Sequence, residues 1–230
     1  RAGMLMAFSL SSFFLFFFFF FFLYYFTILL QGAKLTVLVT LGSLALSTVL
    51  GLVWAVMRVS GIKPLVWIAT TVVNVVRSIP IIVILFYIYF VLPDTGISLS
   101  AMQASILGLG VAYSAYHAEN FRAGIEAIDK GQMEAAQSVG MSWGLAMRRV
   151  ILPQAVKIVL PPYGNIMIMM LKDSSQASTI TVAELALQGK LIATSTLDNA
   201  TVFTLVALMY MVMCVPLILL VRYLEKRNAK

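Results

Sequence analysis

The chain has 230 residues, of which 61% are hydrophobic and only 11% are charged, and its formal net charge is +7. Soluble domains are roughly 45–50% apolar and about 25% charged, so a soluble fold has no place for this much Phe, Leu, Val, Ile and Met. The apolar residues come in runs of about 20 or more, which excludes a large soluble core and indicates transmembrane helices.

The sequence also argues against a catalytic or metal site. Its one cysteine, Cys214, lies in an apolar run, so we expect a packing residue and neither a disulfide framework nor a cysteine-based metal site. The patterns G-x-x-x-x-G-K, H-E-x-x-H and C-x-x-C do not occur. We therefore expect no enzymatic activity, no cofactor and no metal on this chain. In a membrane chain the basic excess reports orientation rather than nucleic-acid binding.

The first 32 residues form a hydrophobic segment that contains a run of phenylalanine at residues 16–22. A segment that is apolar on every side belongs in or on lipid. Two placements are open: a sixth membrane span, or a segment along the interface. A secretory signal is a further alternative, although no clear small-residue cleavage site follows the run.

The remainder of the chain predicts an all-α integral membrane domain, residues 33–225, followed by a basic tail, residues 226–230. We expect five core spans at residues 33–57, 64–91, 101–121, 161–187 and 201–223. Pro161 and Pro162 are expected to open the fourth of these. A short basic loop, a turn-rich loop, a charged segment and a polar loop connect the spans, at residues 58–63, 92–100, 122–160 and 188–200.

Lysine and arginine are distributed unevenly over the two sides that these spans create. One side holds Arg58, Lys63, Arg122, Lys130, Arg148, Arg149, Lys157, Arg222, Lys226, Arg227 and Lys230, and the other holds Lys34 and Lys190. Because basic residues stay on the cytoplasmic side, this bias predicts that the charged segment and the C-terminus are cytoplasmic. The residue before Ala33 then lies outside, and a sixth span returns the N-terminus to the cytoplasm.

Small residues recur at helical spacing in the third span, on two neighbouring stripes. They are Ala104, Gly108 and Ala112, and Gly110, Ser114 and Ala118. Small residues four positions apart let helices approach closely in lipid. The pattern fits packing within the chain and fits a subunit interface equally well.

The charged segment contains an unusual arrangement at residues 131–156. Ala135 and Ala136 favour a helix, Gly140 is suited to end it at positive φ, and Pro153 fits the first turn of a following helix. We expect two short helices at an angle that form a compact knob, and such a knob fits a groove on a partner. From the residues alone, a solvated interhelical hairpin remains the alternative.

These residues also carry a family resemblance. Glu134-Ala135-Ala136, then Gly140, with Leu-Pro twelve residues after the glycine, resembles the EAA loop of permease subunits of ATP-binding-cassette (ABC) importers. That family prefers Ile two residues before the Leu-Pro, where this chain has Val150. The segments RSIP, ENFRAGI, LPQAVKIVLPPYGN and LKDSS look like the polar amino-acid uptake branch, at residues 77–80, 119–125, 152–165 and 171–175. The resemblance covers the chain from about residue 30 onward.

The resemblance implies a fold like that of type I ABC importers in a bacterial inner membrane. It implies a second permease subunit, identical or related, a cytoplasmic ATPase dimer that holds ATP and Mg, and an extracytoplasmic solute-binding protein. Nucleic acid is not an expected partner. The residues expected at the ATPase contact are Glu134, Ala135, Ala136, Gly140, Trp143, Arg148 and Arg149.

Charged residues also lie deep in two expected spans. Arg77 is about 20 Å from the cytoplasmic start of the second span, and Lys172 and Asp173 are about 15 Å into the fourth, at ~1.5 Å per residue. Such charges usually face a bundle interior or an aqueous cavity. Nearby, Pro80 is expected to disrupt the second span, and the run KDSSQAST is expected to weaken the fourth.

Our hypothesis is that Arg77 binds a substrate carboxylate and that Asp173 accepts from the α-ammonium group. Ser174, Ser175 and Asn74 would add hydrogen bonds, and the surplus cation Lys172 mildly favours an acidic amino acid such as glutamate or aspartate. An internal Arg77–Asp173 ion pair that only joins helices is the structural alternative.

Two neighbouring groups in the third span receive structural interpretations. We expect His117 to be a packed polar residue, and Glu119 and Arg122, three positions apart, to form an ion pair on the helix surface.

These features favour a permease subunit that forms half of a translocation pathway and couples to an ATPase through residues 131–156. Two other functions remain open at this point. One is a membrane scaffold or sensor that recruits a soluble partner. The other is an ion-driven secondary transporter, which would usually show paired broken helices in internal repeats.

Overall fold

The computed structural model describes the backbone of residues 2–228 and the side chains of residues 23–227. This range consists of helices, turns and loops and contains no strand, so the all-α prediction is confirmed. The α-helices are α1 (Ala2–Val59), α2 (Lys63–Ser78), α3 (Ile81–Phe86), α4 (Ala101–Glu126), α5 (Lys130–Ser138), α6 (Trp143–Ala146), α7 (Leu152–Asp173), α8 (Leu185–Thr196) and α9 (Asn199–Asn228).

Helix α1 continues across residue 32, where the Phe-rich segment was expected to end. It runs from Ala2 to Val59 without a break at residue 32, so the Phe-rich segment and the first expected span share one helix. The side chains of residues 16–22 lie outside the described residues. The membrane placement of that run therefore stays a prediction.

Two described helices are long and apolar enough to cross a membrane, at Leu23–Val59 and Asn199–Arg227. The pair α2 and α3, taken as one bent span with the turns that follow, gives a third. Helices α4 and α7, with 26 and 22 residues, are long enough but more polar. A helix surrounded by other helices does not need an apolar surface on every side. The number of five core spans stays a prediction.

The second expected span is broken rather than continuous. Helix α2 ends at Ser78, Ile79 and Pro80 are extended, and the chain continues into α3 at an angle of 99°. Pro80 has no backbone N–H and disfavours helical geometry in the residue before it. The disruption expected from Pro80 within the span at residues 64–91 is thus confirmed.

The fourth expected span is also placed differently. Helix α7 begins at Leu152, with Pro153 in its first turn as expected, and continues through Pro161 and Pro162, which do not open it. It ends at Asp173, where the chain tightens into a 3₁₀ helix, η4 (Ser174–Ile180). The weakening expected from the run of Asp and Ser is confirmed, because these side chains compete for backbone hydrogen bonds. A span reaching residue 187 is wrong.

The expected polar loop at residues 188–200 is wrong as well, because most of it belongs to helix α8. The Glu184 side chain caps this helix by accepting from the amides of Ala186 and Leu187. One face of α8 is buried, at Leu185, Gly189, Ile192 and Ala193. The buried face and the cap outweigh the polar composition of the opposite face.

Two wide π-helical turns occur in the part of the chain that the structure describes, and each precedes a Leu-Pro pair. They are η1 (Tyr87–Val91), before Leu92-Pro93, and η3 (Met147–Ile151), before Leu152-Pro153. A proline ring clashes with the carbonyl four residues earlier in a regular helix. The wider π-helical turn relieves this clash, so the chain can remain helical up to each proline.

Helix α4 lies at the centre of the packing. Its first turn is closed by a capping box between Ser100 and Gln103, and it packs against α1, α2, α3 and α7. Gly108 lies against Leu85, and Gly110 lies against Leu46, so closely that an added Cβ would collide. The small residues of this helix therefore serve packing within the chain.

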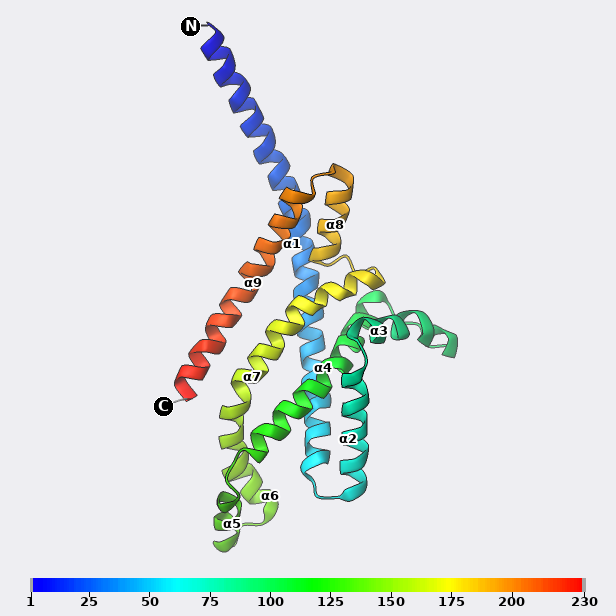
Figure 1. Ribbon diagram of the computed structural model, residues 1–230, viewed down its shortest axis with the longest axis vertical. Helices are drawn as coiled ribbons and strands as arrows, with labels where there is room; N and C mark the ends of the chain where they lie inside the picture. The colour runs from blue at the N-terminus through cyan, green and yellow to red at the C-terminus, as the bar shows by residue number, and fades with distance from the viewer. Residues whose placement is uncertain (1, 229–230) are drawn as a thin grey trace.

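Several of the connecting segments lie at two opposite ends of the molecule (Figure 1). Helices α5 and α6 and the connection between α1 and α2 lie at the lower end, and α8 lies toward the upper end. The basic loop of residues 58–63 thus shares an end with the segment that contains the EAA-like motif.

Candidate functional site

The first part of the site is a knob formed by residues 130–146. Its first helix, α5, is capped by Asp129, whose carboxylate accepts from the Gly131 amide at 2.6 Å. Its second helix, α6, is capped by Ser142, whose hydroxyl accepts from the Leu145 amide at 3.4 Å. Each cap lies within three residues of the group it bonds, so the local sequence sets both helix starts.

Helix α5 ends in a turn built on Gly140. This residue has φ of 86°, and its amide donates to the carbonyl of Gln137 at 2.9 Å. The Met141 amide donates to the carbonyl of Ala136 at 3.1 Å. This pair of bonds is the Schellman ending, which favours glycine at its left-handed position. The expected helix end at Gly140 is confirmed. The second helix is not isolated, because α6 continues through η3 into α7.

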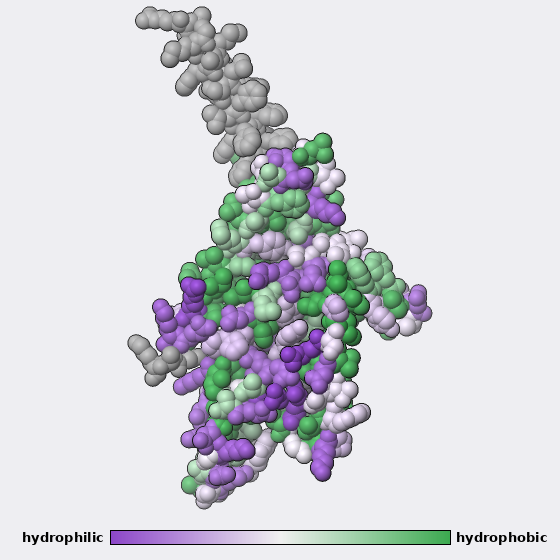
Figure 2. All heavy atoms as spheres, in the orientation of Figure 1, coloured by the Kyte–Doolittle hydropathy of each residue, from purple (hydrophilic) through white to green (hydrophobic). Residues whose placement is uncertain are grey.

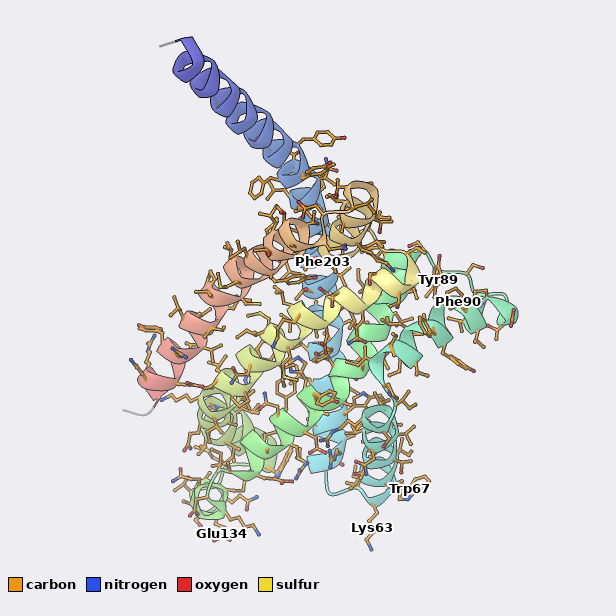
Figure 3. The ribbon with its side chains drawn as sticks, turned by 45° about the horizontal axis from the view of Figure 1, so that its top comes forward. Lys63, Trp67, Tyr89, Phe90, Glu134 and Phe203 are labelled. Carbon is orange, nitrogen blue, oxygen red and sulfur yellow. The ribbon has the colours of Figure 1, made fainter. Side chains whose placement is uncertain are left out.

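Most of the residues expected at the ATPase contact are exposed, either on this knob or on η3 directly after it. The exposed ones are Glu134, Ala135, Gly140, Trp143, Arg148 and Arg149. Ala136 is 6% exposed and supports the knob from within. Sequence reasoning missed Val139, which is 75% exposed beside Gly140. Glu134 lies at the end of the molecule (Figure 3).

The second part of the site surrounds Arg77, in the last turn of α2. Its Nη1 atom donates to Oε1 of Glu119 on α4 at 3.1 Å. The guanidinium carbon also lies 5.6 Å from the ring centre of Tyr116, within range of a cation–π contact. Both partners come from α4, so this helix determines where the Arg77 charge lies.

Glu119 gathers three arginines from three helices. Arg58 of α1 donates to Oε1 at 2.8 Å, and Arg122 of α4 donates to Oε2 at 2.8 Å and also pairs with Glu126. The expected Glu119–Arg122 pair is confirmed. The contacts to Arg58 and Arg77, 61 and 42 positions away, were not visible in the sequence.

Asp173 is bonded to a second residue of α4. The buried hydroxyl of Tyr113 donates to Oδ2 of Asp173 at 2.7 Å. The rings of Tyr113 and Tyr116 lie 5.7 Å apart. The ion pairs of the described residues do not include Arg77 with Asp173, so that structural alternative is not supported. The sequence did contain one indication of this arrangement: residues 113, 116 and 119 are three positions apart and therefore neighbours on the surface of one helix.

The other expected substrate residues are distributed around this region. Ser174 is buried, and its hydroxyl donates to the carbonyl of Leu171, at the end of α7, at 2.8 Å. Ser175 is half-buried and Asn74 is exposed. Lys172 is exposed and lies within electrostatic reach of Cys214 on α9. Successive residues of a helix point about 100° apart, so Lys172 and Asp173 face different neighbours.

His117 is packed rather than coordinating, as expected. It is fully buried, its ring centre lies 5.6 Å from that of Phe121 and 4.7 Å from that of Tyr163, and neither ring nitrogen has a hydrogen-bond partner. Cys214 is a buried free thiol, as expected.

Sequence reasoning missed a buried carboxylate, Glu184. Besides capping α8, its Oε2 atom accepts from the Thr36 hydroxyl of α1 at 3.3 Å and from the Tyr210 hydroxyl of α9 at 2.9 Å. One fully buried side chain therefore ties three helices together. A glutamate directly before a helical run is a weak signal for a cap, and its other partners lie far away in the sequence.

Comparisons with known proteins identify the family of this chain. Residues 47–230 match the family described as binding-protein-dependent transport system inner membrane component. The chain is 44% identical over 201 residues to the probable glutamine ABC transporter permease protein GlnM of Bacillus subtilis (strain 168), covering 87% of this chain and 93% of that protein. It is 34% identical over 201 residues to the L-cystine transport system permease protein TcyB of the same organism, covering 87% and 86%.

Solved structures show the same architecture. One, described as an amino acid ABC transporter with histidines, superposes with a TM-score of 0.83 at 37% identity, covering 89% of this chain and 96% of that one. The MetNI methionine ABC transporter in an inward-facing conformation gives 0.74 at 22% identity, covering 89% and 98%, and supports the fold alone. The chain therefore belongs to the binding-protein-dependent inner membrane components: it is a permease subunit of an amino-acid ABC transporter, and separate subunits hydrolyse the ATP.

Proposed function

We propose that this permease subunit carries a polar amino acid across the membrane and holds it between Arg77 and Asp173. One observation carries the proposal. Helix α4 links the two groups, because Tyr113 bonds Asp173 while Tyr116, three positions later, lies in contact range of Arg77. A guanidinium group suits a carboxylate, and a carboxylate suits an ammonium group, so the pair has the polarity of a zwitterion.

The surface around α4 and α7 supports a shared translocation pathway. Figure 2 shows hydrophilic residues over the middle and lower part of this face, flanked by hydrophobic ones. A surface that faces lipid carries few such residues. We propose that this face meets a second permease subunit, identical or related, so that each copy supplies half of the pathway.

The knob is the proposed contact with the ATPase dimer. Val139 and Trp143 expose apolar surface there, 75% and 51% of each residue. The knob shares its end of the molecule with the basic loop at residues 58–63 (Figure 1). Basic loops stay in the cytoplasm, so we propose that the knob and the C-terminus are cytoplasmic. A solute-binding protein would then deliver the amino acid at the opposite end.

The finer proposal concerns the side chain of the substrate. The expected preference for an acidic amino acid rested on Lys172, whose side chain is exposed. The remaining support is the surplus of positive charge around Glu119, where three arginines meet the one carboxylate of Glu119. The relative GlnM is named for glutamine, so glutamine and glutamate form the decisive pair.

The test is ATP-dependent uptake by the permease reconstituted in vesicles with its ATPase and binding protein. Labelled L-glutamine and L-glutamate are supplied separately and in competition, and stronger uptake of glutamate supports the acidic preference. In this system Arg77→Ala should abolish uptake, because the carboxylate loses its partner. The complex should still assemble, measured by co-purification of the ATPase.

Arg222→Ala is the matched control, since Arg222 is an exposed arginine near the end of α9. It removes the same charge outside the proposed site and should leave uptake unchanged. Uptake by Arg77→Ala at the level of Arg222→Ala would show that the site is assigned incorrectly. No uptake of either amino acid by the unaltered complex would contradict the proposed substrates.

A further inference from the structure

Both groups proposed to hold the amino acid already have partners on α4. Arg77 is bonded to the Glu119 carboxylate, and Asp173 is bonded to the Tyr113 hydroxyl. The partners have the chemistry of the substrate. Glu119 offers Arg77 a carboxylate, and Tyr113 donates a hydrogen bond to Asp173, as an ammonium group would.

The two partners hold Arg77 and Asp173 at different heights along α4. Positions 113 and 119 are six residues apart, which is about 9 Å along a helix axis. Oε1 of Glu119 accepts from Nη1 of Arg77, so a substrate carboxylate that bonds this guanidinium group competes with Glu119 for it.

The contacts of Glu119 keep the free-energy cost of releasing Arg77 low. Arg77 makes the longest of the three arginine contacts, 3.1 Å against 2.8 Å for both Arg58 and Arg122. The Arg77 side chain is also the most exposed of the three, at 42% against 11% and 30%. When Arg77 leaves, Glu119 keeps two charged donors, which avoids the high cost of an unpaired carboxylate away from water.

The backbone next to Arg77 also permits movement. Arg77 lies in the last turn of α2, and the chain becomes extended two residues later, at Ile79 and Pro80. The residues after it therefore do not hold it in a continuous helix. Arg58 and Arg122, in contrast, keep Glu119 in place from α1 and α4.

We infer that Glu119 is an internal competitor that occupies Arg77 when no amino acid is bound, and that the substrate carboxylate displaces it. This inference rests on the proposed role of Arg77. Glu119 then sets the apparent affinity, because only molecules with Arg77 released are competent to bind. Glu119 also favours dissociation of the amino acid, because it bonds Arg77 again when the substrate carboxylate leaves.

The test compares Glu119→Gln with the unaltered permease in the reconstituted complex, using whichever of L-glutamine and L-glutamate that complex transports. Removing the competing charge should lower KM, by roughly tenfold if about a tenth of the molecules have Arg77 free. The maximal rate should fall at the same time, because release loses its assistance. A purely structural role would not lower KM.

Glu126→Gln is the matched control. Glu126 lies on the same helix and pairs with Arg122, and Arg77 is paired with Glu119 instead. Its KM should equal that of the unaltered permease. If Glu119→Gln yields no assembled complex, Glu119→Asp replaces it. The shorter acid retains the negative charge between the helices but lengthens its contacts, and the contact with Arg77 is already the longest. KM should again fall.

The outcomes separate this inference from the proposed function. If Arg77→Ala still supports uptake, the binding site fails and the inference fails with it. If Arg77→Ala abolishes uptake while the Glu119 variant leaves KM equal to or above that of Glu126→Gln, the binding site stands and only the competition is refuted.

Discussion

The knob at residues 130–146 and the polar contacts between the transmembrane helices are built in opposite ways. In the knob, Asp129, Ser142 and Gly140 set helix starts and a turn through bonds to residues at most three positions away. Between the helices, Glu119 reaches Arg58 across 61 positions, and Glu184 reaches Thr36 across 148. The first region can be anticipated from the chain, whereas the second exists only after the helices have packed.

This difference has an energetic consequence. A solvated cap or turn that is lost leaves its groups free to bond water, so the cost is limited. A buried carboxylate that loses its hydrogen-bond donors cannot bond water instead. The same holds for buried donors that lose their carboxylate. Substitutions among the helices should therefore affect the folded state more than substitutions in the knob.

Glu184→Ala should have the largest effect on stability. It removes the cap of α8 and leaves the hydroxyls of Thr36 and Tyr210 without their acceptor. The two losses together should cost about 2–4 kcal/mol. The measurement is the thermal unfolding midpoint of the purified complex. Glu225→Ala, at an exposed site on α9, is the control, and equal midpoints for the two variants would contradict the role of Glu184.

Gly140→Ala should have an intermediate effect, confined to the knob. Its φ of 86° is left-handed, and no atom lies near the added Cβ, so the penalty is conformational and about 1–2 kcal/mol. Amide hydrogen exchange should accelerate in α5, and less ATPase should co-purify. Gly144→Ala adds the same methyl group in a helix with open space around it, so it should change neither readout. Identical behaviour of both variants would show that the turn does not need glycine.

Val139→Asp should have the smallest effect on the permease itself, because Val139 is 75% exposed. It places a charge on the apolar surface of the proposed ATPase contact and should weaken assembly about fivefold, or roughly 1 kcal/mol. Titration of the purified ATPase onto the permease measures this. Leu197→Asp is the control, since Leu197 is 86% exposed outside the knob and its φ of 60° suits aspartate. Equal affinity for both would place the contact elsewhere.

The sequence drew attention to single residues within the apolar runs but did not identify their neighbours in the fold. It singled out Arg77, Asp173 and the break at Pro80, because a charge or a proline in an apolar run is conspicuous. It did not reveal Tyr113 as the partner of Asp173, or Arg58 as a partner of Glu119. The group that a side chain faces depends on which helices pack against its own helix. The sequence of one span does not contain that information.

The same limit explains the errors in the helix boundaries. Pro161 and Pro162 were expected to start a helix, but they lie inside α7, and the polar residues after position 187 belong to α8. Local preference is a weak guide where packing on one face supplies most of the stability.

By itself, the sequence determined that this chain is an integral membrane protein with an exposed, glycine-terminated helical knob, because hydropathy and turn chemistry act over a few neighbouring residues. The tertiary structure decided the rest: the bend after α2, the placement of α8, and the sharing of Glu119 among three arginines. Those features depend on groups far apart in the chain that meet only when the helices come together.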